Sequence, residues 1–506
     1  DNLDEELDGW LIKSENYQAL NTILPKFKGK VKAIYIDPPY NTGSDEFIYE
    51  DRFRSSTWLT MMENRLTLAK EFLSEDGVIF VSIAGSLGKY NETHKLGILL
   101  ENIFDKRIVD FIWKRRSGSG SYVISGATEI HEYILCYGKN GANLYKNIIS
   151  TDSMREYKNQ DENGIYKWHS LVINQYTKEE RPNLYYGVVY DFVEDRILFE
   201  KDENNFDHQR QVVIFPSLHG KSVWAMTKDS MKEVYNRGLI KVIKGKKGYE
   251  LKIKKYLYDK TGKIVGNPIK SILDDGCMGW KIGYTSDATK ELKNLLPSVE
   301  FDTVKPVNLI KTLLYVSTDE GDIVLDFFAG SGTTAHAVLL LNKFDKKKRK
   351  FILIEMEDYC FYKIIIPRLK KLAYSLDWKN GAPIGKEGYS MFFKYYELES
   401  YEDVLSKASY GNLSNETFEF FKRDPYNYYV FMNDEKMMNI VEIDYEKNSV
   451  KIFLDNLYQN IDIPESLSVS EGLKIMKIKK ESVYFDKKQV NVQEISLRDL
   501  KRFLFW

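Results

Sequence analysis

Residues 323–341 read IVLDFFAGSGTTAHAVLLL and contain, in order, a short apolar run, a glycine turn and an apolar helical segment. This order predicts a buried strand over 323–328 and a helix over 332–341. Gly330 and Gly332 permit a sharp turn and a close approach of the backbone to a ligand. The new helix also offers unpaired N–H groups at its start. The stretch therefore predicts a strand–turn–helix unit of an α/β sheet that is shaped as a cofactor cradle.

A carboxylate follows this turn at the spacing that a nucleoside cofactor requires. The next predicted strand, KFILIE (350–355), ends in Glu355, and an acid about 20 residues beyond such a turn can accept both hydroxyls of a ribose. The letters GSGTTA also satisfy the dinucleotide pattern GxGxxA. A nicotinamide-dependent oxidoreductase and an enzyme that uses S-adenosylmethionine both fit, and the loop does not choose between them.

A second motif, Asp37-Pro38-Pro39-Tyr40, ends the predicted buried strand 31–36. Two prolines fix φ, remove two N–H donors and stop the strand. The carboxylate of Asp37 and the carbonyl of Pro38 can accept both hydrogens of one amino group, which favours a nitrogen lone pair free to attack, and Tyr40 offers a flat face for stacking. Asp and Pro also form ordinary turns. An oxidoreductase leaves this motif unexplained, whereas methyl transfer to a base amino group accounts for it.

Strands and helices alternate in two parts of the chain, which are separated by a region of different composition. Apolar runs predict further strands at 77–83 and 131–137, and apolar spacing predicts helices at 16–24, 58–73 and 305–316. Buried strands between helices indicate a parallel sheet. From about 150 to 300, tyrosines, lysines and short alternating stretches dominate, with a hairpin signal at 259–262. The simplest architecture is one α/β sheet made from two halves, with an insertion between them and a tyrosine-rich α+β module at the end.

Composition excludes several classes of protein. The 506 residues include 73 basic and 74 acidic side chains, so a net charge of −1 gives no general argument for nucleic-acid binding. Three distant cysteines and six scattered histidines form no metal-site pattern, so we expect no metal and a reducing, cytoplasmic compartment. No apolar run approaches the ~20 residues that cross a membrane. The chain begins with Asp1 rather than Met, so we expect further sequence upstream.

Taken together, these segments resemble DNA amino-methyltransferases of the β class, in which the catalytic motif precedes the cofactor motif. The resemblance is closest to modification (Mod) subunits of Type III restriction–modification systems. It covers about 1–150 and 275–395. It rests on the stretches IYIDPPYNTGSDEF (34–47), WLTMMENRL (58–66), GVIFVSI (77–83), HEYILCY (131–137), GY (283–284), ATKELKNLL (288–296), FDTVKPVNLIKTLL (301–314) and DFFAGSGTTAHA (326–337).

The resemblance implies methyl transfer from S-adenosylmethionine to N6 of a flipped adenine in double-stranded DNA, by a permuted Rossmann-like sheet. It implies a methyltransferase domain split into a catalytic half (1–149) and a cofactor-binding half (301–392), a target recognition domain (150–300), and a C-terminal domain (393–506) for dimerisation or partner docking. It also implies a homodimer and assembly with an ATP-dependent restriction (Res) subunit.

Matched motifs assign roles to individual residues. Asp37, Pro38, Pro39 and Tyr40 match the base-amino motif. The residues that match cofactor-binding positions are Asp326, Phe327, Phe328, Ala329, Gly330, Ser331, Gly332 and Thr333 in the glycine loop, Glu355 as the ribose acid, Lys305 and Pro306 in a segment that closes over the cofactor, and Glu15 and Asn16 near the adenine. Ala84-Gly85 departs from the family, which usually has acidic residues there.

Two basic segments are candidates for DNA contact. Residues 241–270 hold ten lysines and two acids, a net charge of +8, with tyrosines between them. From this window we select Lys244, Lys246, Lys247, Lys254 and Lys255 as phosphate contacts, whose binding would fall with salt. A solvated hairpin face is the alternative. Lys114, Arg115 and Arg116 precede a glycine-serine stretch and suggest a mobile basic loop beside the active site. His131 and His336 are expected to pack or hydrogen-bond locally.

Other functions fit parts of the same pattern. A solitary methyltransferase needs no restriction subunit. A cytosine-N4 methyltransferase uses the same amine chemistry, although that group more often has Ser where Asp37 stands. A non-catalytic DNA-binding specificity subunit would bind DNA without methyl transfer, and the intact motifs argue against it.

Overall fold

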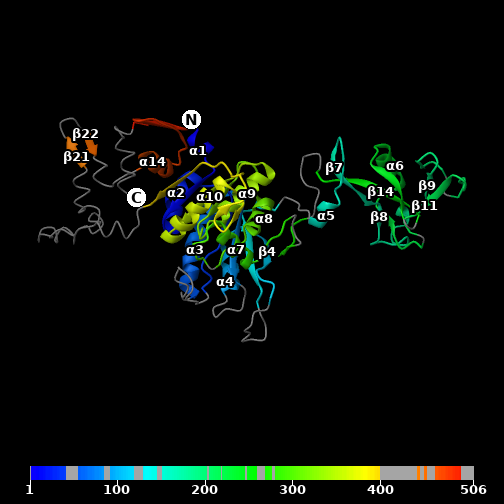
Figure 1. Cartoon of the computed structure of the whole chain (residues 1–506), viewed down its shortest axis with the longest axis horizontal. Coiled ribbons are helices and arrows are strands. Elements are labelled where there is room, and N and C mark those ends of the chain that lie inside the picture. Colours follow the sequence, from blue (N-terminus) through cyan, green and yellow to red (C-terminus); the bar gives the residue numbers. More distant parts are fainter. Residues whose placement is uncertain are drawn as a thin grey trace. The chain divides into compact units, whose positions relative to one another are not determined.

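The computed structural model describes residues 2–41, 55–84, 92–118, 129–144, 151–201, 204–217, 219–245, 248–258, 268–275, 280–301, 303–398, 441–444, 449–452 and 462–491. The chain divides into two compact units. The first contains Asp1–Lys146 and Ile269–Trp506, and the second contains Asn147–Pro268. The second unit is thus inserted, along the sequence, between two segments of the first (Figure 1).

The first unit is built on a mixed sheet. Within the described ranges it has nine strands in the order β15-β4-β5-β3-β2-β16-β17-β1-β20. In chain order these are β1 (Gly9–Lys13), β2 (Val31–Ile36), β3 (Leu73–Ala84), β4 (Lys106–Lys114), β5 (His131–Gly138), β15 (Ile272–Leu273), β16 (Ile323–Asp326), β17 (Lys350–Glu355) and β20 (Phe393–Glu397). The run β3-β2-β16-β17-β1-β20 is parallel, so the carboxyl ends of these strands share one edge.

Strand β5 differs from the parallel arrangement that the sequence predicts. It runs antiparallel to both β3 and β4, so the expected direction is wrong for this strand. The chain leaves β4 and returns in β5 as a hairpin, since the N–H of Arg115 donates to the carbonyl of Ile130 across the start of the ladder. Two strands joined in this way are antiparallel. The reversal brings His131 and Glu132, at the start of β5, to the edge where β2 and β3 end.

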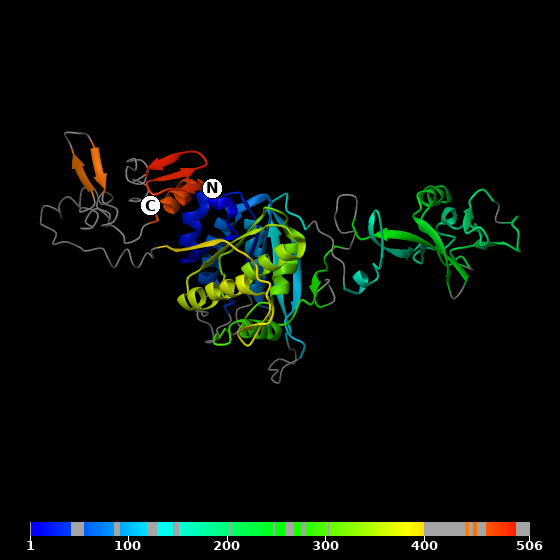
Figure 2. The ribbon, with the colours of Figure 1, turned by 45° about the horizontal axis from the view of Figure 1, so that its top comes forward.

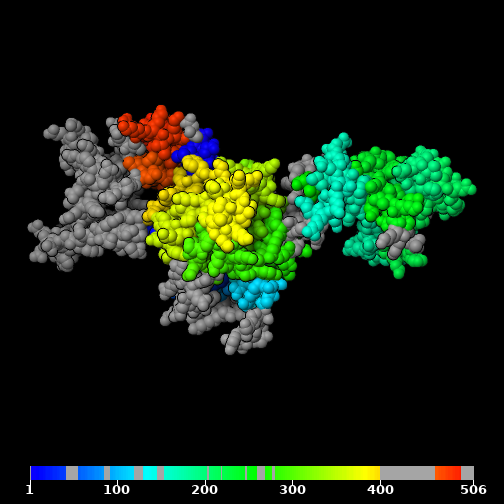
Figure 3. Space-filling model, in the orientation of Figure 1, coloured from blue at the N-terminus to red at the C-terminus, as the bar shows by residue number. Residues whose placement is uncertain are grey.

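Helices cover both faces of the sheet (Figure 2). On one face, α2 (Asn16–Phe27), α3 (Ser55–Phe72) and α4 (Glu92–Ile103) share a buried cluster with alternate strand residues such as Ile34, Ile36 and Val81. On the other, α8 (Val307–Ser317) contacts β2 and α9 (Thr333–Asp345) contacts β17. The π-helical turn η2 (Tyr359–Ile365) and α10 (Ile366–Tyr374) follow. In the space-filling view of Figure 3, the green-to-yellow atoms at the front of the first unit belong to the segment that follows the insertion.

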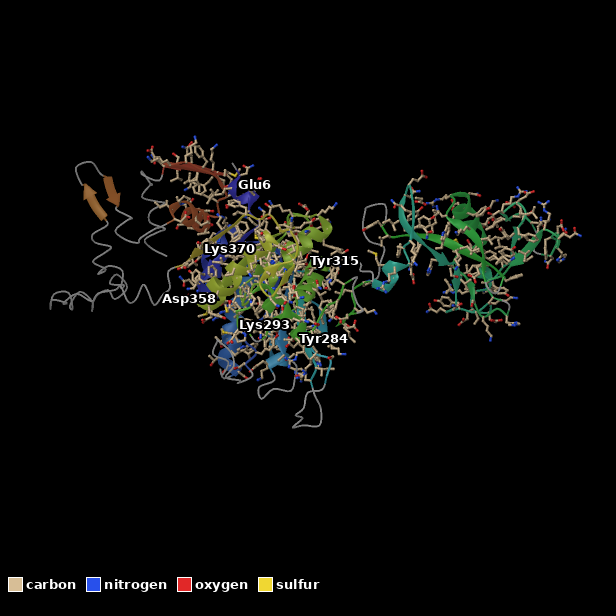
Figure 4. All side chains as sticks on the ribbon, viewed as in Figure 1. Glu6, Tyr284, Lys293, Tyr315, Asp358 and Lys370 are labelled. Carbon is tan, nitrogen blue, oxygen red and sulfur yellow. The ribbon has the colours of Figure 1, made fainter. Side chains whose placement is uncertain are left out.

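Residues 269–300 belong to the first unit. This differs from the sequence-based prediction, in which they are part of the insertion. Strand β15 pairs with β4. Helix α7 (Thr285–Leu295) buries Ala288 and Leu292 against Cys360 and Ile364. Tyr284, labelled in Figure 4, is the N-cap of α7 and follows Gly283, whose carbonyl accepts from the Trp113 indole. These are contacts over long sequence separations, which composition does not reveal.

The described parts of 393–491 also belong to the first unit. Strand β20 extends the main sheet beside β1. Helix α14 (Ile463–Glu471) packs on α2 and is followed by the strands β23 (Ile475–Ile478), β24 (Ser482–Phe485) and β25 (Gln489–Asn491). Lys26 of α2 is buried between Asp4 and Glu465, at 2.9 and 3.4 Å. The remaining elements of the unit are α1 (Leu3–Glu6) and the hairpins β18 (Trp378–Lys379)–β19 (Ala382–Pro383) and β21 (Val441–Asp444)–β22 (Ser449–Ile452).

The second unit is a small β-rich domain around the buried residues Trp224, Met231, Ile240 and Leu251. Its elements are α5 (Thr151–Arg155), β6 (Asn159–Asp161), β7 (Gly164–Ser170), β8 (Val172–Ile173), η1 (Pro182–Leu184), β9 (Val188–Asp191), β10 (Arg196–Leu198), β11 (Gln211–Ile214), β12 (Val223–Trp224), α6 (Lys228–Asn236), β13 (Ile240–Gly245) and β14 (Gly248–Tyr256). Its largest sheet has the order β13-β14-β7-β6. The hairpin predicted at 259–262 lies outside the described residues.

Among the helices of the described residues, none is both long and apolar enough to span a membrane.

Candidate active site

The two sequence motifs, almost 300 residues apart in the chain, lie at one edge of the sheet. Strands β2 and β16 are parallel neighbours, with Ile34 opposite Leu325. Asp37 follows β2 directly, and the glycine loop follows β16 directly. Since parallel neighbours end at the same edge, the Asp-Pro-Pro-Tyr corner and the glycine loop face a common space, where open α/β sheets bind ligands.

The Asp-Pro-Pro-Tyr corner is held by its surroundings. The indole N–H of Trp58, on α3, donates to the carbonyl of Pro39 at 2.8 Å. Asn41 then takes a left-handed conformation, with φ of 55°. Within the corner, the hydroxyl of Tyr40 donates to Oδ1 of Asp37 at 2.7 Å. The prolines and these contacts leave the Asp37 carboxylate and the Tyr40 ring with little freedom.

Lys305 meets this corner rather than the glycine loop. Its Nζ lies 2.6 Å from Oδ2 of Asp37 and 5.1 Å from the centre of the Tyr40 ring. Pro306, beside it, is the N-cap of α8. Burial lowers the pKa of Lys305, but the facing carboxylates of Asp37 and Glu132 outweigh it and raise this pKa above its ordinary value. Lys305 therefore stays charged in the site.

One residue beside this corner, Glu132, has no role predicted from the sequence. Glu132, on β5, accepts from the Tyr40 hydroxyl at 3.2 Å, lies 3.4 Å from Lys305 Nζ, and lies 3.3 Å from a guanidinium nitrogen of Arg115. Burial and the charges of Asp37 and Glu132 raise the pKa of Tyr40 well above its ordinary value, so its hydroxyl remains a donor. A carboxylate in the otherwise apolar run HEYILCY is the sequence signal that identifies Glu132.

The glycine loop has the predicted sharp turn. Gly330 and Gly332 take positive φ values of 50° and 74°, and Gly332 is the N-cap of α9. A Cβ on Gly332 would lie 3.2 Å from Ile365. Asp326 holds the loop from within, because it accepts from the N–H of Phe328 and the hydroxyl of Thr334. Burial, with the charges of Asp37 and Glu355, raises the pKa of Asp326 to about 7.

Glu355 ties the end of β17 to the same loop. One carboxylate oxygen accepts from the N–H of Gly330 at 2.7 Å, and the other accepts from the N–H groups of Met356 and Glu357, each at 2.9 Å. Ala329 also donates its N–H to Ile354, the residue before Glu355. The predicted ribose acid is therefore beside the predicted cradle, at the same edge of the sheet.

Arg368, on α10, contacts the residues at the start of α9. Its guanidinium is almost fully buried and contacts the carbonyl of Ser331, the hydroxyl of Thr333 and Nδ1 of His336. Burial lowers the pKa of Arg368 to about 10. Burial and this guanidinium lower the pKa of His336 well below its ordinary value, so His336 is a neutral acceptor with a local role. Ser331 and Thr333 are thus positioned through a residue that the sequence analysis did not select.

The segment Ser14–Asn16 joins the glycine loop from the other side. Nδ2 of Asn16 donates to the carbonyl of Phe327 at 3.0 Å, and Arg65 of α3 bonds the side chains of both Asn16 and Glu15. Ser14 donates its backbone N–H to the carbonyl of Glu355, while its buried hydroxyl has no hydrogen-bond partner among the described residues. Arg65 was not selected from the sequence, because a single Arg on a helix is an unspecific signal.

Beside Ser14, Lys13 forms an ion pair with Asp358 at 2.6 Å. Asp358, labelled in Figure 4, precedes η2. The pair links the end of β1 to the chain just beyond Glu355, and so borders the same cradle.

The basic residues near the site are not a loose loop in their described part. Lys114 ends β4 opposite His131. Arg115 accepts at its carbonyl from the N–H of Thr285 and faces Glu132 through its side chain. Arg116 donates to the carbonyl of Glu129. Arg115 therefore belongs to the polar group around Glu132, whereas Arg116 is exposed and bonds to the chain just before β5.

The lysines of the second unit are divided between two faces of its largest sheet. Lys254 lies opposite Trp168, pairs with Asp161 at 2.7 Å and lies over the ring of Tyr166. Successive residues of a strand point to opposite faces, so Lys255 points away from Lys254. The register puts Lys244 on the face of Lys255, and both are exposed. Lys246 and Lys247 lie outside the described residues.

The chain is similar in sequence to a family of known proteins. A sequence model of the DNA methylase family matches residues 31–366, a span that contains both loops. The chain is 32% identical over 425 residues to the "Type III restriction-modification enzyme EcoPI Mod subunit" of Escherichia phage P1, across 76% of this chain and 62% of that protein. It is 30% identical over 446 residues to the "Probable type III restriction-modification enzyme HindVI Mod subunit" of Haemophilus influenzae, across 78% and 55%.

A shorter relative is the "Type II methyltransferase M.KpnI" of Klebsiella pneumoniae, which is 29% identical over 355 residues, across 67% of this chain and 77% of that protein. The chain spans 62% and 55% of the lengths of the two Mod subunits. Because the family model spans more than half of the chain and includes both halves of the site, the chain belongs to the DNA methylase family.

Proposed function

We propose that this chain transfers a methyl group from S-adenosylmethionine to N6 of a flipped adenine in double-stranded DNA, as the modification and recognition subunit of a Type III restriction–modification system. The observation that carries the proposal is that Asp37 and the Gly330–Gly332 turn follow neighbouring parallel strands at one edge of the sheet. The names of the Mod subunits that the chain resembles support the system to which we assign it.

The residues at this edge fit S-adenosylmethionine. The positive φ values of Gly330 and Gly332 open a cradle before α9, Glu355 is the acid for a ribose, and the buried Ser14 hydroxyl lacks a partner among the described residues. Glu15 and Asn16 border the same space. When bound there, S-adenosylmethionine supplies an electrophilic methyl group on a sulfonium. The turn between β16 and α9 is completed by the remaining residues of the loop, which are Asp326, Phe327, Phe328, Ala329, Ser331 and Thr333.

Asp37 prepares the attacking nitrogen. The amino nitrogen of a nucleobase is a weak nucleophile, because its lone pair is delocalised into the ring. In the proposed reaction the Asp37 carboxylate and the Pro38 carbonyl accept hydrogen bonds from its two N–H groups, so the nitrogen becomes more tetrahedral. Its lone pair forms the new N–C bond as the C–S bond of the sulfonium breaks, the sulfur keeps that electron pair, and the nitrogen then releases one proton to water. Tyr40 stacks on the flipped base, a contact that contributes about 1–3 kcal/mol. Such positioning accounts for much of the rate of an in-line transfer.

DNA contact involves both units. We propose that the second unit carries the target recognition function and that Lys244 and Lys255 contact phosphates, together with Lys246 and Lys247, which follow Gly245 in the sequence. Lys254 stays a candidate, but its pairing with Asp161 reduces the charge available to DNA. In the first unit, Lys114 and Arg116 flank the active site as phosphate contacts, whereas Arg115 contributes through Glu132.

We propose that the sheet is a methyltransferase sheet in permuted order, because the Asp-Pro-Pro-Tyr motif precedes the glycine loop in the chain. The names of the Mod subunits that the chain resembles also suggest partners. We propose that the chain forms a homodimer and docks an ATP-dependent restriction subunit, in part through residues beyond 398. The described segments β20 and α14 pack on the first unit instead, so they support the methyltransferase fold.

Transfer of label tests the activity directly. The purified chain is incubated with S-adenosylmethionine that is labelled in the methyl group and with unmethylated genomic DNA. Labelled N6-methyladenine in the hydrolysed DNA is the expected product. Labelled N4-methylcytosine would assign the cytosine reaction instead, and DNA binding without any label would identify a binding subunit.

The variant Asp37→Asn tests the mechanism. It keeps the size of the side chain but puts an NH2 donor where an acceptor is needed, so transfer should fall by about 100-fold or more. Calorimetric affinity for S-adenosylmethionine is the control and should change little, because Asp37 is on the other loop. Transfer at the original rate would remove Asp37 from the mechanism.

A further inference from the structure

One ammonium is shared by two carboxylates in the candidate active site. Nζ of Lys305 lies 2.6 Å from Oδ2 of Asp37 and 3.4 Å from Oε2 of Glu132. The Lys305 side chain is 8% exposed and that of Glu132 is 6% exposed, whereas that of Asp37 is 25% exposed. Lys305 and Glu132 thus form the buried part of the group, and Asp37 is its more open member.

Both oxygens of Asp37 have partners in this arrangement. Oδ1 accepts from the Tyr40 hydroxyl, and Oδ2 accepts from Lys305. A base amino group that bonds to Asp37 must therefore compete with an ammonium, and hydrogen bonds between charged groups are the stronger kind. If Lys305 left Asp37 with no other anion beside it, a buried and unpaired charge would remain, which is costly.

Glu132 is placed to receive this ammonium. It lies on β5, opposite Ala84 of β3 and Trp113 of β4, so its backbone is fixed on both sides. Its Oε1 faces Arg115, and its Oε2 faces Lys305 and lies 3.2 Å from the Tyr40 hydroxyl, whose one hydrogen it shares with Oδ1 of Asp37. The same oxygen that steadies Tyr40 is thus within reach of Lys305 after a small movement of Nζ.

The geometry points to Glu132 as a positioning residue, which shares Lys305 with Asp37 before the target enters and retains Lys305 when the target amino group takes its place. Tyr40 keeps a hydrogen-bond acceptor in Glu132 throughout, so its ring stays oriented for stacking. This inference rests on the proposed amino-methyltransferase function and deepens it, because it explains how Asp37 becomes available to the base.

Stability measurements test the sharing without any activity. Asp37→Asn alone leaves Glu132 as the partner of Lys305, and E132Q alone leaves Asp37. Only the double variant leaves the ammonium with no carboxylate among the described residues. The loss of thermal midpoint in the double variant should therefore exceed the sum of the two single losses. A strictly additive double variant would overturn the sharing.

Kinetics test the positioning role. In E132Q, Lys305 keeps Asp37 as its one carboxylate partner among the described residues, so the amino group competes less well for Asp37 after DNA has bound. We expect kcat to fall by about 10- to 100-fold, with the dissociation constants for DNA and for S-adenosylmethionine within about twofold of the unaltered chain. E132Q with the original kcat would overturn the role.

A matched control separates this effect from damage to the fold. Glu465, on α14, is a buried acid that pairs with Lys26 and Lys394 and with none of the site residues named above. E465Q should lower the thermal midpoint but leave kcat unchanged. If the unaltered chain transfers no label, the proposed function fails, and the stability measurements still decide whether Lys305 is shared. If it transfers label and E132Q does so equally fast, only the positioning role fails.

Discussion

Nδ2 of Asn16 donates a hydrogen bond to the carbonyl oxygen of Phe327 at 3.0 Å, although 311 positions separate the two residues in the chain. The bond joins the first turn of α2 to the glycine loop. Asn16→Ala should leave that carbonyl without its partner and cost about 1–3 kcal/mol of stability, with weaker binding of S-adenosylmethionine. Calorimetry and chemical unfolding measure both effects.

The control for this variant is Asn21→Ala. Asn21 lies on the same helix, but its exposed side chain donates to the carbonyl of Tyr17 within that helix. It should change cofactor affinity little. Equal effects of the two variants would contradict a specific role for the Asn16–Phe327 bond.

Gly332→Ala should distort the cofactor cradle. Gly332 has φ of 74°, and an added Cβ would lie 3.2 Å from Ile365. A left-handed conformation costs an L-residue about 1–2 kcal/mol. We therefore expect a lower thermal midpoint and weaker binding of S-adenosylmethionine. Gly97→Ala, within α4, is the opposite case: nothing lies within 4 Å of its Cβ position, so alanine should be tolerated or stabilising.

Lys26→Met should destabilise the first unit strongly. Lys26 is buried and faces Asp4 and Glu465. Removing one member of a buried ionic group typically costs about 3–5 kcal/mol, since the other members stay buried. The comparison is Lys28→Met, which breaks an exposed pair with Glu71 and should cost about 1 kcal/mol or less. Similar losses in urea unfolding would show that the buried group is not important for stability.

Asp326 should make stability depend on pH. Burial raises its pKa from 3.8 to about 7 in the folded chain, so the folded state binds a proton that the unfolded state releases. The stability that this bound proton gives to the folded chain is fully present below about pH 4 and is lost as the pH rises to about 7. Asp326→Asn cannot lose a proton, so its thermal midpoint relative to the unaltered chain should rise between pH 5 and pH 8. A constant difference would contradict the raised pKa.

The double variant K244A/K255A should weaken DNA binding. Both lysines are exposed on one face of the β13-β14-β7 sheet. Each lost phosphate contact should reduce the slope of log affinity against log salt by about one unit. K254A should mainly loosen the second unit, because Lys254 is paired with Asp161. A larger change of slope in K254A would place the DNA on the other face.

Local chemistry explains which parts of this protein can be predicted from its sequence. The positive φ values at Gly330 and Gly332 occur where glycines follow a short apolar run, and Asp37 follows a buried strand because prolines stop that strand. Glu355 is the acid that ends the apolar run of β17, so its place at the end of a strand can also be recognised from its neighbours in the sequence. Each of these features depends on a few neighbouring residues, so the glycine turn, the proline corner and the acid could be predicted.

Tertiary structure decided the rest, because strand pairing and burial join residues that are distant in the chain. The direction of β5 depends on its hairpin with β4, and this direction brings Glu132 to Tyr40. Lys305 meets Asp37 although the sequence suggested a cofactor contact, since a buried ammonium requires a nearby carboxylate. The sequence alone determined which loops can carry the chemistry, whereas only the folded sheet determined which charges surround Asp37.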